Sequence, residues 1–150
     1  MAGVFKVGLR WGMDDFSRQI DFLERHSTYA RRWLSARPEW VDWLGIQGQK
    51  KVDLPGIRNL LGECQVTPAS NEQDEAEWMA NLRLARQRLM LWVAFRDLNG
   101  LADLDEVTHA LSHFAELAVS TSIAFIREDL KSRFGLPWSN TTQSEMPLMV

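Results

Sequence analysis

The sequence of 150 residues lacks several features that mark large classes of protein. It contains one cysteine, Cys64, so it has neither an internal disulfide nor a cysteine pair for a metal, which fits a reducing compartment. No apolar run approaches the ~20 residues that span a bilayer, and no signal peptide is recognisable at the start. The net charge of −3 gives the chain no overall attraction for nucleic acid or anionic membranes. These absences predict a soluble, cytoplasmic protein that binds neither nucleic acid nor membrane.

Motifs that carry chemistry are also missing from the chain. There is no glycine-rich phosphate loop of the G-x-G-x-x-G or Walker type. Ser120, Thr121 and Ser122 lie inside a helical pattern rather than on the strained turn that exposes a nucleophile. The sequence therefore assigns no catalytic, cofactor-binding or metal-binding residue, and we expect the chain alone to be inactive.

What the sequence does contain is the composition of one globular domain. Hydrophobic residues make up 45% of the chain, including seven Trp and seven Phe. Their helical spacing predicts two or three short helices over residues 14–44, of which Pro38–Leu44 is one and is expected to end at Gly45 and Gly48. Another short helix is predicted over 55–64, after a polar loop over 47–53.

Two long helices are predicted in the second half of the chain. The first runs over 74–98, with Ser70 or Asn71 as a plausible N-cap and acidic residues in its first turns. Its apolar residues form two stripes, one of Trp78, Leu82, Ala85, Leu89 and Trp92 and one of Leu84, Leu91, Phe95 and Leu98. Because a helix that is apolar on two sides is sandwiched, this is expected to be the central helix.

The second long helix is predicted over 103–134, ending at Gly135. It is opened by the capping-box pattern Asp103-x-x-Glu106. We expect its core face to be Leu104, Val107, Leu111, Phe114, Ala118, Ser122 and Phe125, opposite Glu106, His109, His113, Glu116, Ser120 and Arg127. The short connection 99–102 makes the two long helices an antiparallel hairpin. The predicted fold class is all-α, an antiparallel helical bundle with no sheet before residue 145.

The end of the chain differs from the rest. A polar linker over 136–145 is followed by the apolar residues 146–150, which resemble the first half of a buried strand. We therefore expect the chain to be a fragment cut inside that strand. The alternative is a short apolar tail that packs on the helices.

The histidines and tryptophans suggest further hypotheses. His109, His113 and Glu116 are spaced so that one helix face could present them to a metal ion, but their place on the polar face favours a solvated surface. His26 is more simply a partner for the C-terminal dipole of an early helix. Trp78 and Trp92 are expected in the core rather than stacked on bases of a single strand.

The arginines of the central helix leave two interpretations open. Arg83, Arg86 and Arg88 have no acidic residue three or four positions away, so their charges are met by solvent and a neighbouring helix, for example at Glu116, or by another domain or protein. Arg96 extends the Trp78–Trp92 stripe. Its guanidinium is expected to be partly buried and bonded to Asp103, Glu106 or helix-end carbonyls.

Several segments, in order, resemble one enzyme family. Residues 79–97, 100–108 and 111–118 closely resemble bifunctional glutamine synthetase adenylyltransferase/adenylyl-removing enzymes. Ala36-Arg-Pro-Glu-Trp-Val-Asp-Trp-Leu44 is similar to the family's RPEW-type element, and Pro147-Leu-Met-Val150 to the strand before its glycine-rich loop. The resemblance covers roughly residues 20 to 150, apart from 47–70 and 136–146, which match nothing specific.

This resemblance implies an enzyme with two nucleotidyltransferase halves. One half attaches AMP from ATP to a tyrosine of glutamine synthetase, the other removes it by phosphorolysis, and PII-type signal proteins set the balance. The implied glycine-rich loop and the paired aspartates that hold Mg²⁺ would follow Val150, so none of these residues can be carried onto this chain.

The resemblance further implies the role of this segment. Residues 1–135 would be a helical domain, 136–145 a linker and 146–150 the beginning of the first catalytic core. The segment would support that core and help to shape the surface that meets glutamine synthetase, with no Mg²⁺ or ATP bound to itself. The alternative is a free-standing helical interaction module that binds an acidic partner through Arg83 and Arg86.

Overall fold

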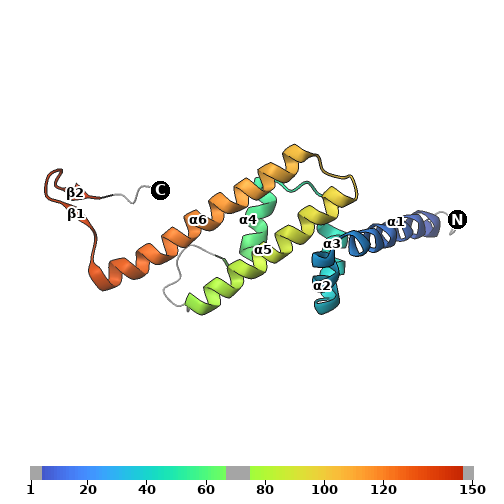
Figure 1. Cartoon of the computed structure of the whole chain (residues 1–150), viewed down its shortest axis with the longest axis horizontal. Helices are drawn as coiled ribbons and strands as arrows, with labels where there is room; N and C mark the ends of the chain where they lie inside the picture. The colour runs from blue at the N-terminus through green and yellow to red at the C-terminus, as the bar shows by residue number, and fades with distance from the viewer. Residues whose placement is uncertain (1–4, 67–74, 147–150) are drawn as a thin grey trace.

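The computed structural model describes residues 5–66 and 75–146, with side chains described over 15–66, 75–127 and 130–146. Within these ranges the chain forms six helices and one small hairpin (Figure 1). The helices are α1 (Phe5–His26), α2 (Thr28–Ala36), α3 (Glu39–Gln47), α4 (Leu54–Glu63), α5 (Glu75–Leu98) and α6 (Leu104–Phe134), and the strands are β1 (Trp138–Ser139) and β2 (Ser144–Glu145). The predicted all-α class is confirmed. None of the described helices is both long enough and apolar enough to cross a membrane.

Side-chain caps define where three of the helices begin. Ser27 accepts a hydrogen bond from the Ala30 backbone N–H at 3.1 Å, and Asp53 and Asp103 cap α4 and α6 in the same way at 2.8 Å. Each cap satisfies one of the N–H groups that a helix start leaves without a partner. The predicted N-cap of the central helix, Ser70 or Asn71, lies outside the described residues.

Helix α3 does not end at Gly45, which was one of the two glycines predicted to end it. Gly45 lies inside α3, which ends at Gln47 with Gly48 as its C-cap, so only Gly48 marks the end as predicted. At Gly48 a Cβ atom would lie 2.4 Å from the Phe95 ring and 2.6 Å from the Leu44 carbonyl oxygen. A glycine is therefore required here because α3 and α5 approach closely, although its φ of −58° is ordinary.

Helix α5 is the centre of the molecule and contacts each of the other helices. One of its stripes packs with α4 and α6 in a cluster that includes Trp78, Leu89 and Trp92. The other packs with α1, α2 and α3 through Leu91 and Phe95. The prediction of a sandwiched helix is thus confirmed, because it separates two apolar clusters on opposite sides.

Helices α5 and α6 form the predicted antiparallel hairpin (Figure 1), but the core face of α6 was partly wrong. Glu106 and Ala110 are buried, whereas Leu104 is 76% and Leu111 39% exposed. The first turns of α6 are oriented so that the Glu106 carboxylate forms an ion pair with Arg96 of α5. In this orientation Leu104 faces solvent.

The prediction of no sheet before residue 145 was also wrong. Strands β1 and β2 pair antiparallel, with Trp138 opposite Glu145 and Ser139 opposite Ser144, inside the segment predicted to be a linker. A Ser139 hydroxyl that accepts from the Thr142 N–H at 3.2 Å helps to close the turn. The strand expected over 146–150 lies, beyond Met146, outside the described residues.

Candidate functional site

His109 and His113, whose spacing suits metal ligands but whose place on the polar face favours a solvated surface, do not converge with a third ligand among the described residues. The His109 and His113 rings are 6.1 Å apart, and the His109 Nδ1 lies 2.7 Å from the Asp105 carbonyl oxygen of its own helix. Over the part of the chain that the structure describes, no three His, Cys, Asp or Glu side chains form a metal-ligating group. His26 similarly contacts the Phe22 carbonyl oxygen at 2.8 Å, at the end of α1.

The hydroxyl groups of α6 are likewise used inside the helix. Ser120 donates to the Leu117 carbonyl and Ser122 to the Ala118 carbonyl, at 3.1 and 2.6 Å. This back-bonding within a helix is the ordinary role of serine there. No basic side chain among their described hydrogen-bond partners activates them as nucleophiles.

Arg96 and Glu106 form the buried junction between the two long helices. The Arg96 Nε donates to Glu106 Oε1 at 2.6 Å, and Nη2 donates to Oε2 at 3.2 Å. Two further guanidinium hydrogen bonds reach the Gly48 and Leu101 carbonyl oxygens, at 3.1 and 2.7 Å. The predicted partners Glu106 and helix-end carbonyls are confirmed, while Asp103 serves only as the cap.

The electrostatics of this junction centre on the Glu106 carboxylate. Burial raises its pKa, but the hydrogen bonds from Arg96 and from the Val52 N–H, at 3.0 Å, together with the arginine charge, hold the pKa below its ordinary value. The carboxylate is therefore ionised and paired. Because Arg96 and the Val52 N–H, which bind this carboxylate, are buried groups that join α5 and the loop before α4 to α6, we assign the junction a structural role.

Arg88 has a neighbouring-helix partner, but not the predicted Glu116. Its guanidinium pairs with Glu63 of α4 at 3.2 Å and lies 4.5 Å from the centre of a Trp43 ring. The nearby Cys64 thiol is buried, and burial raises its pKa against the lowering effect of Arg88. A buried thiol with a raised pKa is a poor nucleophile. Arg83 and Arg86 remain exposed.

The most distinctive surface feature is an apolar stripe on the second half of α6. Val119, Ile126, Leu130 and Phe134 are 48%, 52%, 47% and 81% exposed, and Ile123 lies among them. Their spacing of three and four residues puts them on one face of the helix. That face points away from the side that packs on α4 and α5. We call these five residues the outer stripe.

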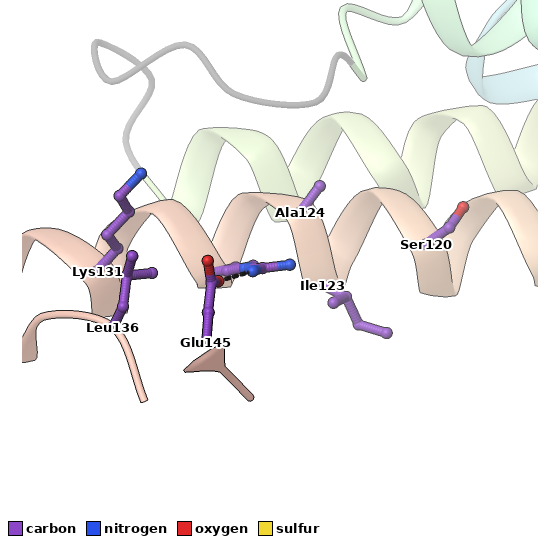
Figure 2. Close-up of a pocket in the computed structure, with 7 residues that line it drawn as sticks. Ser120, Ile123, Ala124, Lys131, Leu136 and Glu145 are labelled. Atoms are coloured by element: carbon purple, nitrogen blue, oxygen red, sulfur yellow. Dashed lines mark hydrogen bonds and ion pairs between the residues drawn. The ribbon is translucent and has the colours of Figure 1, made fainter. Parts of the chain in front are cut away.

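The terminal hairpin lies beside the outer stripe and creates two adjoining hollows. The more apolar one, of about 370 Å³, is lined by residues that include Ile126, Leu130, Leu136 and Met146. The other, of about 430 Å³, is shown in Figure 2, where Glu145 extends from β2 to α6. There Glu145 forms an ion pair with Arg127, so a charged contact fixes the hairpin to the helix.

The sequence does indicate the outer stripe, although the predicted core face of α6 did not include these residues. In the second half of α6, apolar residues recur on two faces, as they do in α5. One of these faces packs on α5, where the Trp78 ring stacks on the Phe125 ring with centroids 4.9 Å apart. In the described residues the opposite face is covered only at its end, by Leu136 and Met146. Exposed apolar patches of this kind mark surfaces for other proteins or domains.

The fold and these contacts define a class of protein: an all-α chain with an exposed apolar face on its longest helix and no metal-ligating cluster among its described residues. The model of the glutamate-ammonia ligase adenylyltransferase family matches residues 24–150. The chain therefore belongs to this family.

Individual relatives agree with this assignment. A bifunctional glutamine synthetase adenylyltransferase/adenylyl-removing enzyme from Ralstonia nicotianae is 32% identical over 131 residues, covering 87% of this chain and 14% of the relative. The enzyme of that name from Aromatoleum aromaticum is 35% identical over 125 residues, or 83% of the chain and 12% of the relative. The chain thus spans only about an eighth of these relatives. No solved structure gives a significant match.

The Mg²⁺ and ATP implied by the resemblance do not fit the residues that the structure describes. No three carboxylate, histidine or thiol groups converge in this part of the chain, and both hollows beside α6 are lined by one carboxylate at most. The resemblance implies paired aspartates that hold Mg²⁺, and neither hollow supplies such a pair of carboxylates.

Proposed function

We propose that this chain is the helical segment before the first nucleotidyltransferase core of an enzyme that adenylylates and deadenylylates glutamine synthetase in the cytoplasm. In this proposal, the chain supports the core, while the catalytic residues, Mg²⁺ and ATP belong to the core itself. Its partners are the downstream core, glutamine synthetase and a PII-type signal protein. The match to the family over residues 24–150 and the names of the relatives support this assignment.

The observation that carries the supporting role is the outer stripe of α6. A helix with a second, exposed apolar face presents the kind of surface that another protein or domain covers. One face of α6 is covered by α4 and α5 within this chain. The relatives are about eight times longer than their match to this chain, so they contain ample further structure for the other face. We infer that the core packs against Ile126 and Leu130.

This function is tested in a chimera. The segment of the Ralstonia nicotianae enzyme that matches this chain is replaced by residues 24–150, and AMP transfer to and removal from glutamine synthetase are measured. Charges are then placed in the outer stripe with the double variant Ile126→Glu/Leu130→Glu. Leu104→Glu is the matched control, because Leu104 is an exposed apolar residue at the other end of α6.

We expect the chimera to retain both activities, the stripe variant to lose them at least tenfold and the control to stay within twofold. Limited proteolysis should also cut the stripe variant faster between the segment and the core, because the two no longer pack together. An inactive unaltered chimera, or equal activities of the stripe variant and the control, would refute the proposal.

A further inference from the structure

A second surface lies where α2 meets α5, on the other side of the molecule's central helix from α4 and α6. The Tyr29 hydroxyl donates to the Gln87 carbonyl oxygen at 3.2 Å, although the two residues are 58 positions apart. Tyr29 is 38% exposed and its ring lies edge-on to Trp33, with centroids 6.3 Å apart. An aromatic pair of an exposed Tyr29 and a partly buried Trp33 is thus fixed at this helix junction.

Arginines collect around this aromatic pair. The charge of Arg86 acts on the Tyr29 hydroxyl: burial raises the tyrosine pKa and the Arg86 charge opposes that rise. Arg83 lies one helical turn before Arg86, and Arg32 lies one turn after Tyr29 on α2. All three arginines are exposed.

The sequence leaves these charges without local compensation. Residues 25–38 contain four arginines and no acidic residue, and so do residues 78–96. Some members of these segments have partners elsewhere: Arg37 with Glu39, Arg88 with Glu63 and Arg96 with Glu106. In the described part of the chain, Arg32, Arg83 and Arg86 have no such ion pair.

This local excess stands out because the whole chain carries a net charge of −3. Arginine and tyrosine are also the residues enriched at the energetic centres of protein interfaces, where the guanidinium group binds carboxylates in a bidentate manner. Bases of a nucleic acid would need unstacked aromatic faces, but Trp33 is already stacked on Trp40 at 5.6 Å. The charge and the aromatic geometry together favour a protein partner that presents carboxylates.

We propose that Arg32, Arg83 and Arg86, arranged around Tyr29, form a binding surface for an acidic protein segment. The surface is separate from the outer stripe of α6 and does not depend on the assignment of that stripe to the core. Carboxylates of the partner pair with the three guanidinium groups, and the tyrosine ring supplies apolar contact at their centre.

The test uses the 150-residue chain and a fluorescein-labelled peptide of alternating glutamate and glycine. Binding is followed by fluorescence anisotropy as the salt concentration is raised. The surface variant is Arg32→Gln/Arg83→Gln/Arg86→Gln. The control variant, Arg18→Gln/Lys50→Gln/Arg58→Gln, removes the same charge from exposed residues of α1, α4 and the loop between α3 and α4.

We expect binding that weakens as salt increases, a loss of at least about tenfold in the surface variant and less than about twofold in the control. Circular dichroism should show that both variants are folded; if the triple variant is not, Arg86→Gln alone should weaken binding about threefold. Equal losses in the two variants would overturn the proposal, because net charge alone would then explain binding. Tighter binding of an oligothymidylate, or salt-dependent self-association in sedimentation, would overturn it in favour of a nucleic acid or a second copy.

Discussion

At the scale of single residues, the buried pair of Arg96 and Glu106 holds together parts of the chain that are distant in sequence. The arginine joins α5 to the Gly48 and Leu101 carbonyls, and the glutamate also accepts from the Val52 N–H. Removal of one partner from such a pair leaves a buried charge without compensation. The stability of the chain should therefore depend on pH through this glutamate.

We predict that Glu106→Gln lowers the free energy of unfolding by about 3 to 5 kcal/mol at pH 7. The pKa of Glu106 is lowered on folding from an ordinary value of 4.5. The stabilisation is therefore fully present above pH 4.5 and declines as pH falls through the lower pKa of the folded state. Urea unfolding at pH 7, 5, 4 and 3 should show the difference between the wild type and the variant unchanged from pH 7 to pH 5 and smaller at pH 4 and pH 3. A difference that is constant over this range would contradict the prediction.

Two glycines provide a second prediction at this scale. An added Cβ at Gly48 would overlap the Phe95 ring and the Leu44 carbonyl oxygen, whereas at Gly62 nothing lies within 4 Å. Gly48→Ala should therefore destabilise the chain by about 1 to 3 kcal/mol through overpacking. Gly62→Ala, inside α4, should stabilise it by about 0.5 to 1 kcal/mol through helix propensity. Thermal unfolding of both variants checks this, and a shift of equal sign would show that α3 and α5 are not closely packed.

At the scale of the elements, the central helix has two buried faces and one exposed face. Trp92 is 2% exposed, its indole N–H donates to the Lys50 carbonyl at 3.2 Å and its ring lies against Trp43. We predict that Trp92→Ala costs about 3 to 5 kcal/mol. Arg83→Ala, on the exposed face, should cost under about 0.5 kcal/mol. Denaturant unfolding of the two variants compares these faces, and equal losses would mean that they are wrongly assigned.

The sequence predicted α5 well and α6 only in part, for a physical reason. The stripes of α5 are apolar throughout and fix both buried faces, with Leu89 and Phe95 fully buried. In α6, Glu106 reads as a surface residue, because only the position of Arg96 in space makes its burial favourable. An ion pair between two helices leaves no periodic pattern in the sequence. The predicted core face therefore placed Leu104 inside and Glu106 outside in the first turns of α6.

The terminal hairpin and the arginine surface were harder to predict. Each strand has two residues, too few for the alternation that identifies strands. The sequence offered Arg83 and Arg86 as a face for an acidic partner, but it did not bring Tyr29 and Arg32 beside them, because the Tyr29–Gln87 hydrogen bond joins segments 58 positions apart. Short strands thus hid the hairpin, whereas a contact between distant segments hid the full arginine surface.

At the scale of the whole molecule, the described part of the chain has two distinctive surfaces, the outer stripe of α6 and the exposed arginines of α2 and α5, and no metal-ligating cluster. We predict that the pure 150-residue chain neither adenylylates nor deadenylylates glutamine synthetase, because no described residues form a catalytic carboxylate cluster. The measurement is release of labelled AMP, or its incorporation from ATP, by chain purified to homogeneity. Turnover by the chain that survives repeated purification would contradict the prediction.

Helix α6 is one uninterrupted helix of 31 residues, about 46 Å long, and Figure 1 shows it joining the helical body to the distant hairpin. Its first turns are anchored by Glu106 and its last turns bear the outer stripe. Each residue of an α-helix adds about 100° of rotation and 1.5 Å of length. One residue inserted near Ser120 would therefore turn the stripe through more than a quarter of a circle, while seven would restore its direction and displace it by about 10 Å. The number of residues between Glu106 and the outer stripe therefore sets the direction in which the stripe faces relative to the helical body.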